Sequence, residues 1–297
     1  SILYNCVEEY DLVIISTNDY EEDILPLIDH KNNLGISTSF ETIDHINEEY
    51  MGRDLAEKIK YYIKFVKEEF DTKYVLFIGD IIDIPSRYSH IYFDEPFDYP
   101  TPEEWVFPSD FYYADLYTEI GSFSTWDTNQ NNVFAEYHWY GNNDEFDLTP
   151  DIYIGRLACT SKQEVQTVIS KIIDYETSQS WTKDWFSNIV YIAGDGIPFD
   201  EEKIIESEYL QEQLIEIMEG FIPNKIWSSN NKLLNVNNIN NAIEEGAAFV
   251  FFNGHGLHDL WATYMYESTV LVPPGCYRTD HINELTNINQ LPIVLSD

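Results

Sequence analysis

The chain has 297 residues and a hydrophobic content of 44%, which suffices for a large buried core in one large domain or two smaller ones. Its 16 basic and 53 acidic residues give a formal charge of −37, which repels the phosphates of nucleic acids and anionic membrane surfaces. No apolar stretch approaches the length of a membrane span, and the amino end has no basic region followed by an apolar core, so we expect neither a membrane segment nor a signal peptide in this chain.

Strands and helices alternate in the first part of the chain. Leu12–Ser16 is apolar like a buried strand, a helix is predicted over 22–32, and a second strand over 36–41. A second helix is indicated by apolar residues at helical spacing, namely Leu55, Ile59, Tyr62, Ile63 and Val66. A strand at Tyr74–Ile78 follows it. This order of strands and helices is typical of a parallel sheet.

The regular spacing of apolar residues disappears between residues 86 and 150, where aromatic, Asp, Asn and Pro residues dominate. A loop of this length is usually functional or stabilised by an ion. Regular elements resume afterwards, with helices predicted around 165–173, 210–218 and 239–243 and strands at 189–193, 225–227 and 247–252. We therefore predict an α/β subdomain over 1–150, with an irregular insertion at 86–150, and a second α/β subdomain over 151–297 that is incomplete at its carboxyl end.

Oxygen-bearing residues alternate within the irregular stretch, as they do in calcium-binding loops. The candidate ligands of a structural Ca²⁺ are Asp127, Asn129, Asn131, the backbone of Val133 and Glu136. The match to a calcium loop is partial, because Asn132 stands where such a loop has glycine and the final carboxylate comes two residues early. A plain polar turn explains the same residues.

His255 lies between two glycines directly after the apolar run 247–252. The carboxyl ends of parallel strands are where ligands bind and reactive side chains sit, and flanking glycines let the backbone turn sharply and approach a substrate. A histidine that only caps a strand end is the alternative. The three cysteines, Cys6, Cys159 and Cys276, have neither the number of a disulfide framework nor the spacing of a zinc site.

Several segments together resemble the gingipain family of cysteine peptidases. They include Asp151-Ile152-Tyr153-Ile154-Gly155-Arg156-Leu157, the helix residues Lys171-Ile172-Ile173-Asp174-Tyr175-Glu176, the segment Phe252-Asn253-Gly254-His255-Gly256 and the final Asn289-Gln290-Leu291-Pro292, together with Val75-Leu76-Phe77-Ile78-Gly79-Asp80. The resemblance spans most of the chain. It implies an α/β, caspase-like fold of two subdomains with mainly parallel central sheets flanked by helices.

The resemblance also implies a catalytic mechanism. The family's catalytic histidine falls on His255, and its nucleophilic cysteine falls just beyond Asp297, so this chain alone is expected to be inactive without a segment that carries that cysteine. The imidazole would raise the thiolate fraction and protonate the leaving amine. The backbone N–H of Gly256 would donate to the oxyanion. Asp151 matches the acidic residue that orients the histidine, although an exposed Asp at a strand start explains it equally.

Two further residues match substrate-binding positions of the family. Glu164 matches an acidic residue of the primary specificity pocket, which implies cleavage after a basic residue, although an acidic residue in a first helical turn is common for dipole reasons. Trp261 matches an aromatic residue near the substrate cleft, although packing accounts for such an indole. We thus expect a secreted or cell-surface cysteine endopeptidase that acts on peptides or proteins. A peptidase that processes secreted proteins, and a non-catalytic calcium-dependent binding module with this fold, are the alternatives.

Overall fold

The chain forms two compact units, Ser1–Ile173 and Asp174–Asp297. The computed structural model describes residues 9–93, 103–201 and 203–296, so Cys6 and Asp297 lie outside the described residues. The division falls later than the predicted boundary at residue 150, because the strand at Tyr153–Leu157 pairs with the strand at Tyr74–Ile78 of the first unit. Among the described residues, no helix is both long and apolar enough to cross a membrane.

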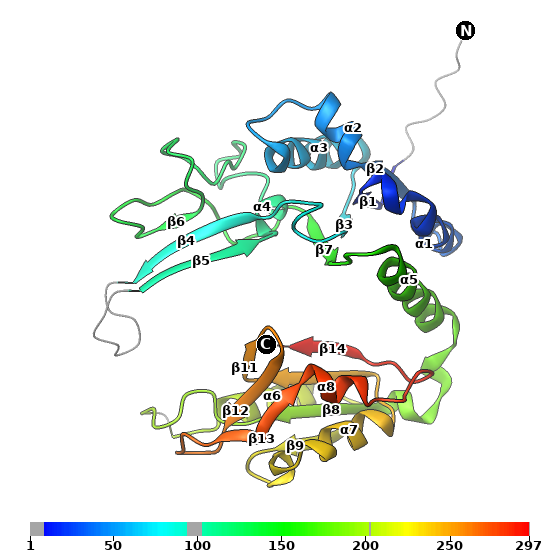
Figure 1. Ribbon diagram of the computed structural model, residues 1–297, viewed down its shortest axis with the longest axis vertical. Coiled ribbons are helices and arrows are strands. Elements are labelled where there is room, and N and C mark those ends of the chain that lie inside the picture. The colour runs from blue at the N-terminus through cyan, green and yellow to red at the C-terminus, as the bar shows by residue number, and fades with distance from the viewer. Residues whose placement is uncertain (1–8, 94–102, 202, 297) are drawn as a thin grey trace. The chain divides into compact units, whose positions relative to one another are not determined.

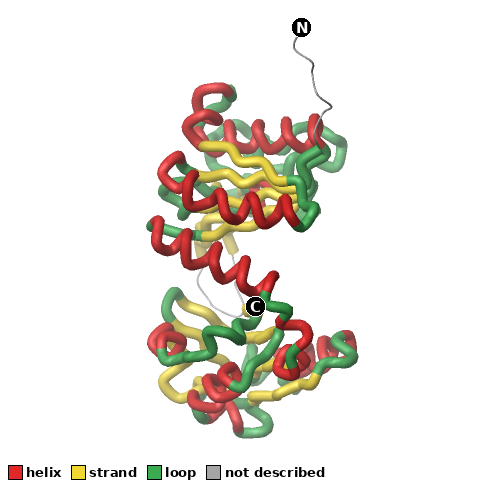
Figure 2. The backbone as a smooth tube through the Cα atoms, turned by 90° about the vertical axis from the view of Figure 1, so that its right-hand side faces the viewer, coloured by secondary structure: helices red, strands yellow, loops and turns green. Residues whose placement is uncertain are grey.

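A parallel sheet forms the centre of the first unit, with the strand order β2-β1-β3-β7 (Figure 1). Its strands are β1 (Leu12–Ser16), β2 (Thr38–Thr42), β3 (Tyr74–Ile78) and β7 (Tyr153–Leu157). Helices cover both faces (Figure 2), and they are α1 (Glu21–Asn33), α2 (Ile43–Glu49), α3 (Leu55–Phe70) and α5 (Lys162–Thr177). Val13 and Ile15 pack with residues of α2 and α3, whereas Leu12 and Ile14 pack with residues of α1 and α5. Alternate residues of one strand therefore face opposite helical layers.

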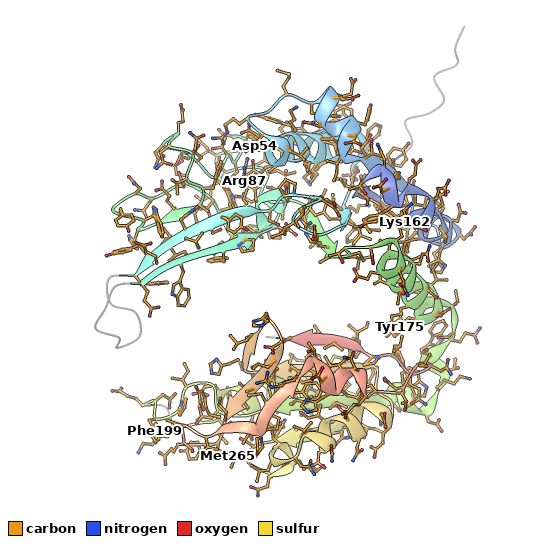
Figure 3. The ribbon with its side chains drawn as sticks, in the orientation of Figure 1. Asp54, Arg87, Lys162, Tyr175, Phe199 and Met265 are labelled. Atoms are coloured by element: carbon orange, nitrogen blue, oxygen red, sulfur yellow. The ribbon has the colours of Figure 1, made fainter. Side chains whose placement is uncertain are left out.

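The stretch 86–150, predicted to be irregular, contains regular elements that the sequence analysis missed. They are β4 (Arg87–Phe93), β5 (Glu103–Ser109), α4 (Phe111–Ala114) and β6 (Glu136–Tyr137), and the three strands form a sheet in the order β5-β4-β6. Arg87 links this sheet to α3, because its guanidinium donates two hydrogen bonds of 2.7 Å to the carboxylate of Asp54, the N-cap of α3 (Figure 3). Paired donors and acceptors of this kind fix both position and orientation.

The second unit repeats the strand order of the first. Its parallel sheet has the order β14-β10-β8-β9, so the first, second, third and fourth strands along the chain occupy equivalent places in both sheets. The strands are β8 (Asn188–Ala193), β9 (Ile222–Trp227), β10 (Phe249–Asn253) and β14 (Ile293–Ser296). Residues of α6 (Glu206–Ile217) pack on one face, and residues of α7 (Val236–Glu244) pack on the other.

A three-stranded antiparallel sheet lies between β10 and β14 in the sequence. Its strands are β11 (His255–Leu257), β12 (Leu260–Tyr264) and β13 (Leu271–Arg278), and the helix α8 (Thr279–Asn283) follows. Short 3-10 segments complete the described elements, at η1 (Asn18–Tyr20), η2 (Ser180–Thr182), η3 (Asp184–Ser187) and η4 (Lys232–Leu234). Only Gly254 separates the end of β10 from the start of β11. The start of the antiparallel sheet therefore lies at the carboxyl end of the central parallel strands.

Candidate active site

His255 lies at the carboxyl end of β10, as predicted, and opens β11. Its side chain is exposed, and its ring meets Tyr264 edge-on with the ring centroids 5.4 Å apart. Gly254 makes this close turn possible, because a Cβ there would lie 2.9 Å from the carbonyl oxygen of Ala262 and 2.9 Å from the ring of Trp261. The glycine before the histidine is therefore required by packing against β12.

Within the part of the chain that the structure describes, one hydrogen bond fixes which ring nitrogen of His255 carries the proton. Its Nε2 lies 2.8 Å from the carbonyl oxygen of Gly196. A carbonyl oxygen only accepts, so Nε2 carries the proton in this contact. In the neutral imidazole, Nδ1 then has a free lone pair and can act as a base.

The segment that contains Gly196 is held to β12 by hydrogen bonds. Asp195 and Tyr264 exchange two backbone hydrogen bonds of 3.0 Å, and the hydroxyl of Thr263 donates to the Asp195 carbonyl at 2.7 Å. Gly194 leaves no room for a side chain, because a Cβ there would lie 2.4 Å from Thr263 Cγ2 and 2.7 Å from the Tyr264 carbonyl oxygen. The position of the histidine's acceptor is thus set by the end of β8 and by β12 together.

Carboxylates gather around this segment, and the sequence analysis did not single them out. Asp195 is only 2% exposed; its Oδ2 accepts from the Glu267 N–H at 3.2 Å and its Oδ1 is buried without a partner. Glu206 accepts from the Gly196 N–H at 3.1 Å. Burial raises the pKa of Glu206, and the nearby Asp200 and Asp195 raise it further. A signal was present in the sequence, since Gly194-Asp195-Gly196 follows an apolar strand just as Gly254-His255-Gly256 does.

A buried glutamate lies further along α6. Glu208 is 6% exposed and accepts hydrogen bonds from the Ser228 hydroxyl at 2.8 Å and the Ser229 N–H at 2.9 Å, directly after β9. Among the described residues, Asp195, Glu206 and Glu208 form no ion pair with a Lys or Arg side chain. A buried carboxylate without a cation is costly, so this end of the sheet favours positively charged groups.

The other predicted site residues have clear places in the structure. The carboxylate of Asp151 accepts from the N–H groups of Leu116 and Tyr117, at 2.6 and 2.9 Å within the first unit. Trp261 is 6% exposed and packs against Phe252, with its Nε1 buried and unpartnered. Gly256 pairs with Trp261 across β11 and β12, and open space surrounds its Cα where a Cβ would be. The roles of these residues toward substrate stay predictions.

Glu164 lies in the first turn of α5, where its carboxylate accepts from the backbone N–H of Thr160 at 2.6 Å and from the Thr160 hydroxyl at 2.9 Å. These hydrogen bonds lower the pKa of Glu164. The side chain also lines a pocket of about 660 Å³ together with Arg156, Cys159 and Lys171. The contact with Thr160 is typical of a carboxylate that stabilises a helix start, and the predicted role in substrate selection stays open.

Cys159 does not have the environment of a nucleophile. Cys159 follows β7 and is 6% exposed, and burial raises the pKa of its thiol, with a further contribution from Glu164. A reactive cysteine needs the opposite shift. Cys276 lies within β13, and both thiols are free of disulfides.

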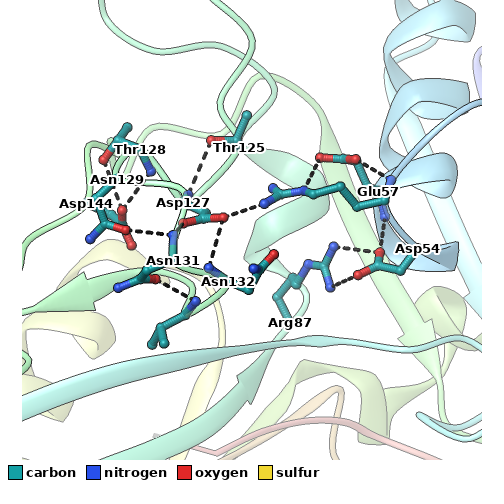
Figure 4. Close-up of polar contacts among 12 residues, drawn as sticks. Asp54, Glu57, Arg87, Thr125, Asp127, Thr128, Asn129, Asn131, Asn132 and Asp144 are labelled. Carbon is teal, nitrogen blue, oxygen red and sulfur yellow. Dashed lines mark hydrogen bonds and ion pairs between the residues drawn. The ribbon is translucent and has the colours of Figure 1, made fainter.

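The predicted calcium loop closes on itself through hydrogen bonds (Figure 4). Asp127 accepts from the Asn131 N–H at 2.9 Å and is paired with Arg53. The side-chain amides of Asn129 and Asn131 approach Glu136 Oε2 at 2.6 and 2.9 Å. Glu136 is 1% exposed and its Oε1 is buried without a partner. Among the residues that the structure describes, no three His, Cys, Asp or Glu side chains converge as a metal site, so further ligands would have to be amide or backbone oxygens.

The parallel sheets with flanking helices define an α/β protein, and the arrangement is consistent with a caspase-like fold. Comparison with known families then identifies the class. A model of Peptidase family C25 matches residues 7–297, and the chain therefore belongs to this family of cysteine peptidases. The resemblance to gingipains, the α/β fold and the assignment to a family of cysteine peptidases are thereby confirmed.

The relatives are longer than this chain. Gingipain R2 of Porphyromonas gingivalis is 26% identical over 296 residues, which cover 98% of this chain and 32% of the relative. Gingipain R1 of the same species has the same identity, with 24% of its length covered. A crystal structure of the Arg-specific cysteine proteinase gingipain R matches with a TM-score of 0.63 and 24% identity, over 99% of this chain and 56% of that one. A complex of the RgpB pro- and mature domains of P. gingivalis matches with a TM-score of 0.61 and 23% identity, over 96% and 55% of the two chains.

Proposed function

We propose that the protein is a cysteine endopeptidase of gingipain type in which His255 is the base and a cysteine just beyond Asp297 is the nucleophile. The contact between Nε2 of His255 and the carbonyl of Gly196 is the observation that supports this most, because it leaves Nδ1 free to accept a proton. The segment that carries this cysteine is then a partner that the described chain requires for activity. Family membership supports a secreted or cell-surface location.

The proposed reaction proceeds through an acyl-enzyme. Nδ1 of His255 takes the thiol proton, the thiolate attacks the peptide carbonyl carbon, and the N–H groups of Gly256 and of the cysteine donate to the oxyanion. The imidazolium then gives its proton to the leaving amine, and water releases the acyl group in a second cycle of the same steps.

We further propose cleavage after a basic residue. The buried carboxylates of Asp195, which follows β8, and of Glu208, in the first turn of α6, have no cation beside them and so support a cationic substrate side chain, and one relative's structure is described as Arg-specific. Two peptides that differ only in Arg or its neutral isostere citrulline before the scissile bond test this. We expect kcat/KM of the full-length protein to be at least about 100-fold higher for Arg, because a buried unpaired carboxylate penalises the neutral analogue. Equal values would refute the basic preference.

The carboxylate responsible can be located with two matched substitutions, Glu164→Gln and Glu208→Gln. Each removes one negative charge and keeps the side-chain size. The variant that lowers the Arg-to-citrulline ratio identifies the pocket residue, because only a carboxylate in contact with the substrate cation contributes to that ratio. Glu164 is the residue that the family resemblance indicates, and Glu208 is the one that is buried without a cation in the second unit.

We also propose that the loop 127–136 binds a structural Ca²⁺. The buried and unpartnered Oε1 of Glu136 supports this, and the two neighbouring Asn side chains would present their oxygens if their amides turned over. Asp127, the Val133 carbonyl and Glu136 would complete the ligand set, with Arg53 released from Asp127.

Calcium binding should raise thermal stability. We expect the melting temperature to be several °C higher in millimolar CaCl₂ than in EGTA, because an ion that binds only the folded state stabilises it. The Glu136→Gln variant should lose this increase. Glu145→Gln is the matched control, since Glu145 is exposed in the same loop region and its carboxylate is not among the predicted ligands. The same increase with MgCl₂, or an unchanged increase in Glu136→Gln, would contradict a calcium site here.

A further inference from the structure

Two hydrogen bonds connect the start of α6 to the imidazole of His255. Glu206, the first residue of α6, accepts from the N–H of Gly196 at 3.1 Å through Oε2. The carbonyl of the same glycine accepts from Nε2 of His255 at 2.8 Å. A single residue without a side chain therefore lies between the carboxylate and the base.

The two ends of this glycine are held differently. The carbonyl of Asp195 is fixed by β12 through Thr263 and Tyr264, so the chain up to Gly196 is anchored. The Gly196 N–H has the Glu206 carboxylate as its partner. This N–H and the Asp195 carbonyl belong to one planar peptide unit, which β12 holds on one side and the carboxylate on the other. If the carboxylate is lost, this unit can tilt and move the Gly196 carbonyl away from the imidazole, because glycine restrains its own dihedral angles least. The surroundings of Gly196 also leave room for its backbone to move, because the nearest atom to a Cβ added there is Glu206 Oε2, at 3.7 Å.

Stabilisation of α6 alone does not account for the contact between the Glu206 carboxylate and Gly196. The N-cap of α6 is Ile205, whose side chain makes no cap hydrogen bond, and acidic residues in a first turn suit the helix dipole. Such a role needs no contact with another segment. The carboxylate instead reaches Gly196, ten residues earlier, and does so beside two other acidic side chains, Asp195 and Asp200, which disfavour its charge.

We propose that Glu206 is a positioning residue: it holds the Gly196 carbonyl where it receives the Nε2–H of His255, and thereby keeps Nδ1 of the imidazole unprotonated and directed toward the nucleophile. This role rests on the proposed function of His255 as the base. It concerns the orientation and the tautomer of the imidazole and assigns no proton transfer to Glu206 itself.

The kinetic test uses substitutions of Glu206 in the full-length protein. Glu206→Met keeps the length and helix propensity but removes the acceptor, and we expect kcat to fall about 10- to 100-fold with KM changed less than about twofold, because a misplaced base slows proton transfer without weakening substrate binding. Glu206→Gln should retain most of kcat, since its amide oxygen still accepts from Gly196. Glu212→Gln is the control on the same helix, where Glu212 is paired with Lys225. If Glu206→Met does not fold, Glu206→Ala provides the same comparison.

A second readout does not depend on activity. In full-length protein labelled with ¹⁵N-histidine, we expect the neutral His255 side chain to be the Nε2–H tautomer in wild type and in Glu206→Gln, and a mixture of tautomers in Glu206→Met. If the wild-type protein is inactive but the tautomer still depends on Glu206, the proposed function fails and the positioning role stands. If Glu206→Met has the wild-type kcat and the wild-type tautomer, the positioning role is wrong.

Discussion

Replacing His255 with alanine should reduce kcat/KM of the full-length protein by about 10⁴-fold or more while leaving its melting temperature unchanged. The expected loss is large because the imidazole would both generate the thiolate and protonate the leaving amine, and removing such a group disables the whole catalytic unit. The expected stability effect is small because His255 is exposed and its described polar contact is with one carbonyl oxygen. Hydrolysis of a fluorogenic peptide and thermal melting measure the two quantities.

His258 provides the matched control, because it lies in the same turn and its side chain is 91% exposed. His258→Ala should keep kcat/KM within about twofold of wild type, since this imidazole only approaches the neighbouring Asp259. A similar loss in both variants would show that the turn, and not the base, is responsible. Retention of activity in His255→Ala would exclude His255 as the base.

Replacing Gly194 with alanine should both destabilise the second unit and lower activity. The new methyl group would lie 2.4 Å from Thr263 Cγ2 and 2.7 Å from the Tyr264 carbonyl oxygen, and the backbone oxygen cannot move without breaking the clamp on Asp195. Overpacking of this kind costs about 1–3 kcal/mol of unfolding free energy. Because the displaced segment carries the Gly196 carbonyl, kcat should fall as well. Urea unfolding and peptide hydrolysis measure the two effects.

Gly155→Ala is the comparison for this variant. Gly155 also belongs to a parallel sheet, in the middle of β7, but a Cβ there would meet only Leu76 Cδ1 at 3.6 Å, an ordinary contact. We expect its stability to stay within about 0.5 kcal/mol of wild type. If Gly194→Ala is equally mild, the close packing between β8 and β12 does not constrain the histidine's acceptor.

The buried strands were predictable because their composition is unambiguous. β1 and β3 have the predicted limits, since Leu12–Ser16 and Tyr74–Ile78 are apolar runs ended by polar residues or glycine. β5 could not be recognised in the same way. Its residues are exposed at nearly every position and include Pro108, so neither a continuous apolar run nor an alternation marks it.

The histidine was predictable from local sequence, whereas the groups around it depend on tertiary contacts. His255 is marked by the apolar strand and the two glycines beside it. Gly196 reaches it across 59 positions of the chain, and Glu206 reaches Gly196 only because α6 packs on the sheet beside β8. Spacing along the sequence carries no information about such a contact. The repeated Gly-X-Gly pattern after β8 is the one local feature that points to this segment.

The most direct test of a cysteine peptidase with His255 as its base is to identify which thiol an arginyl acyloxymethyl ketone modifies in the full-length protein. Intact mass followed by peptide mapping gives the position. We expect a single adduct, on a cysteine directly after Asp297, and its formation should be lost in His255→Ala because the thiolate is no longer generated. An adduct on Cys159 or Cys276, or unchanged labelling in His255→Ala, would contradict the proposed catalytic pair.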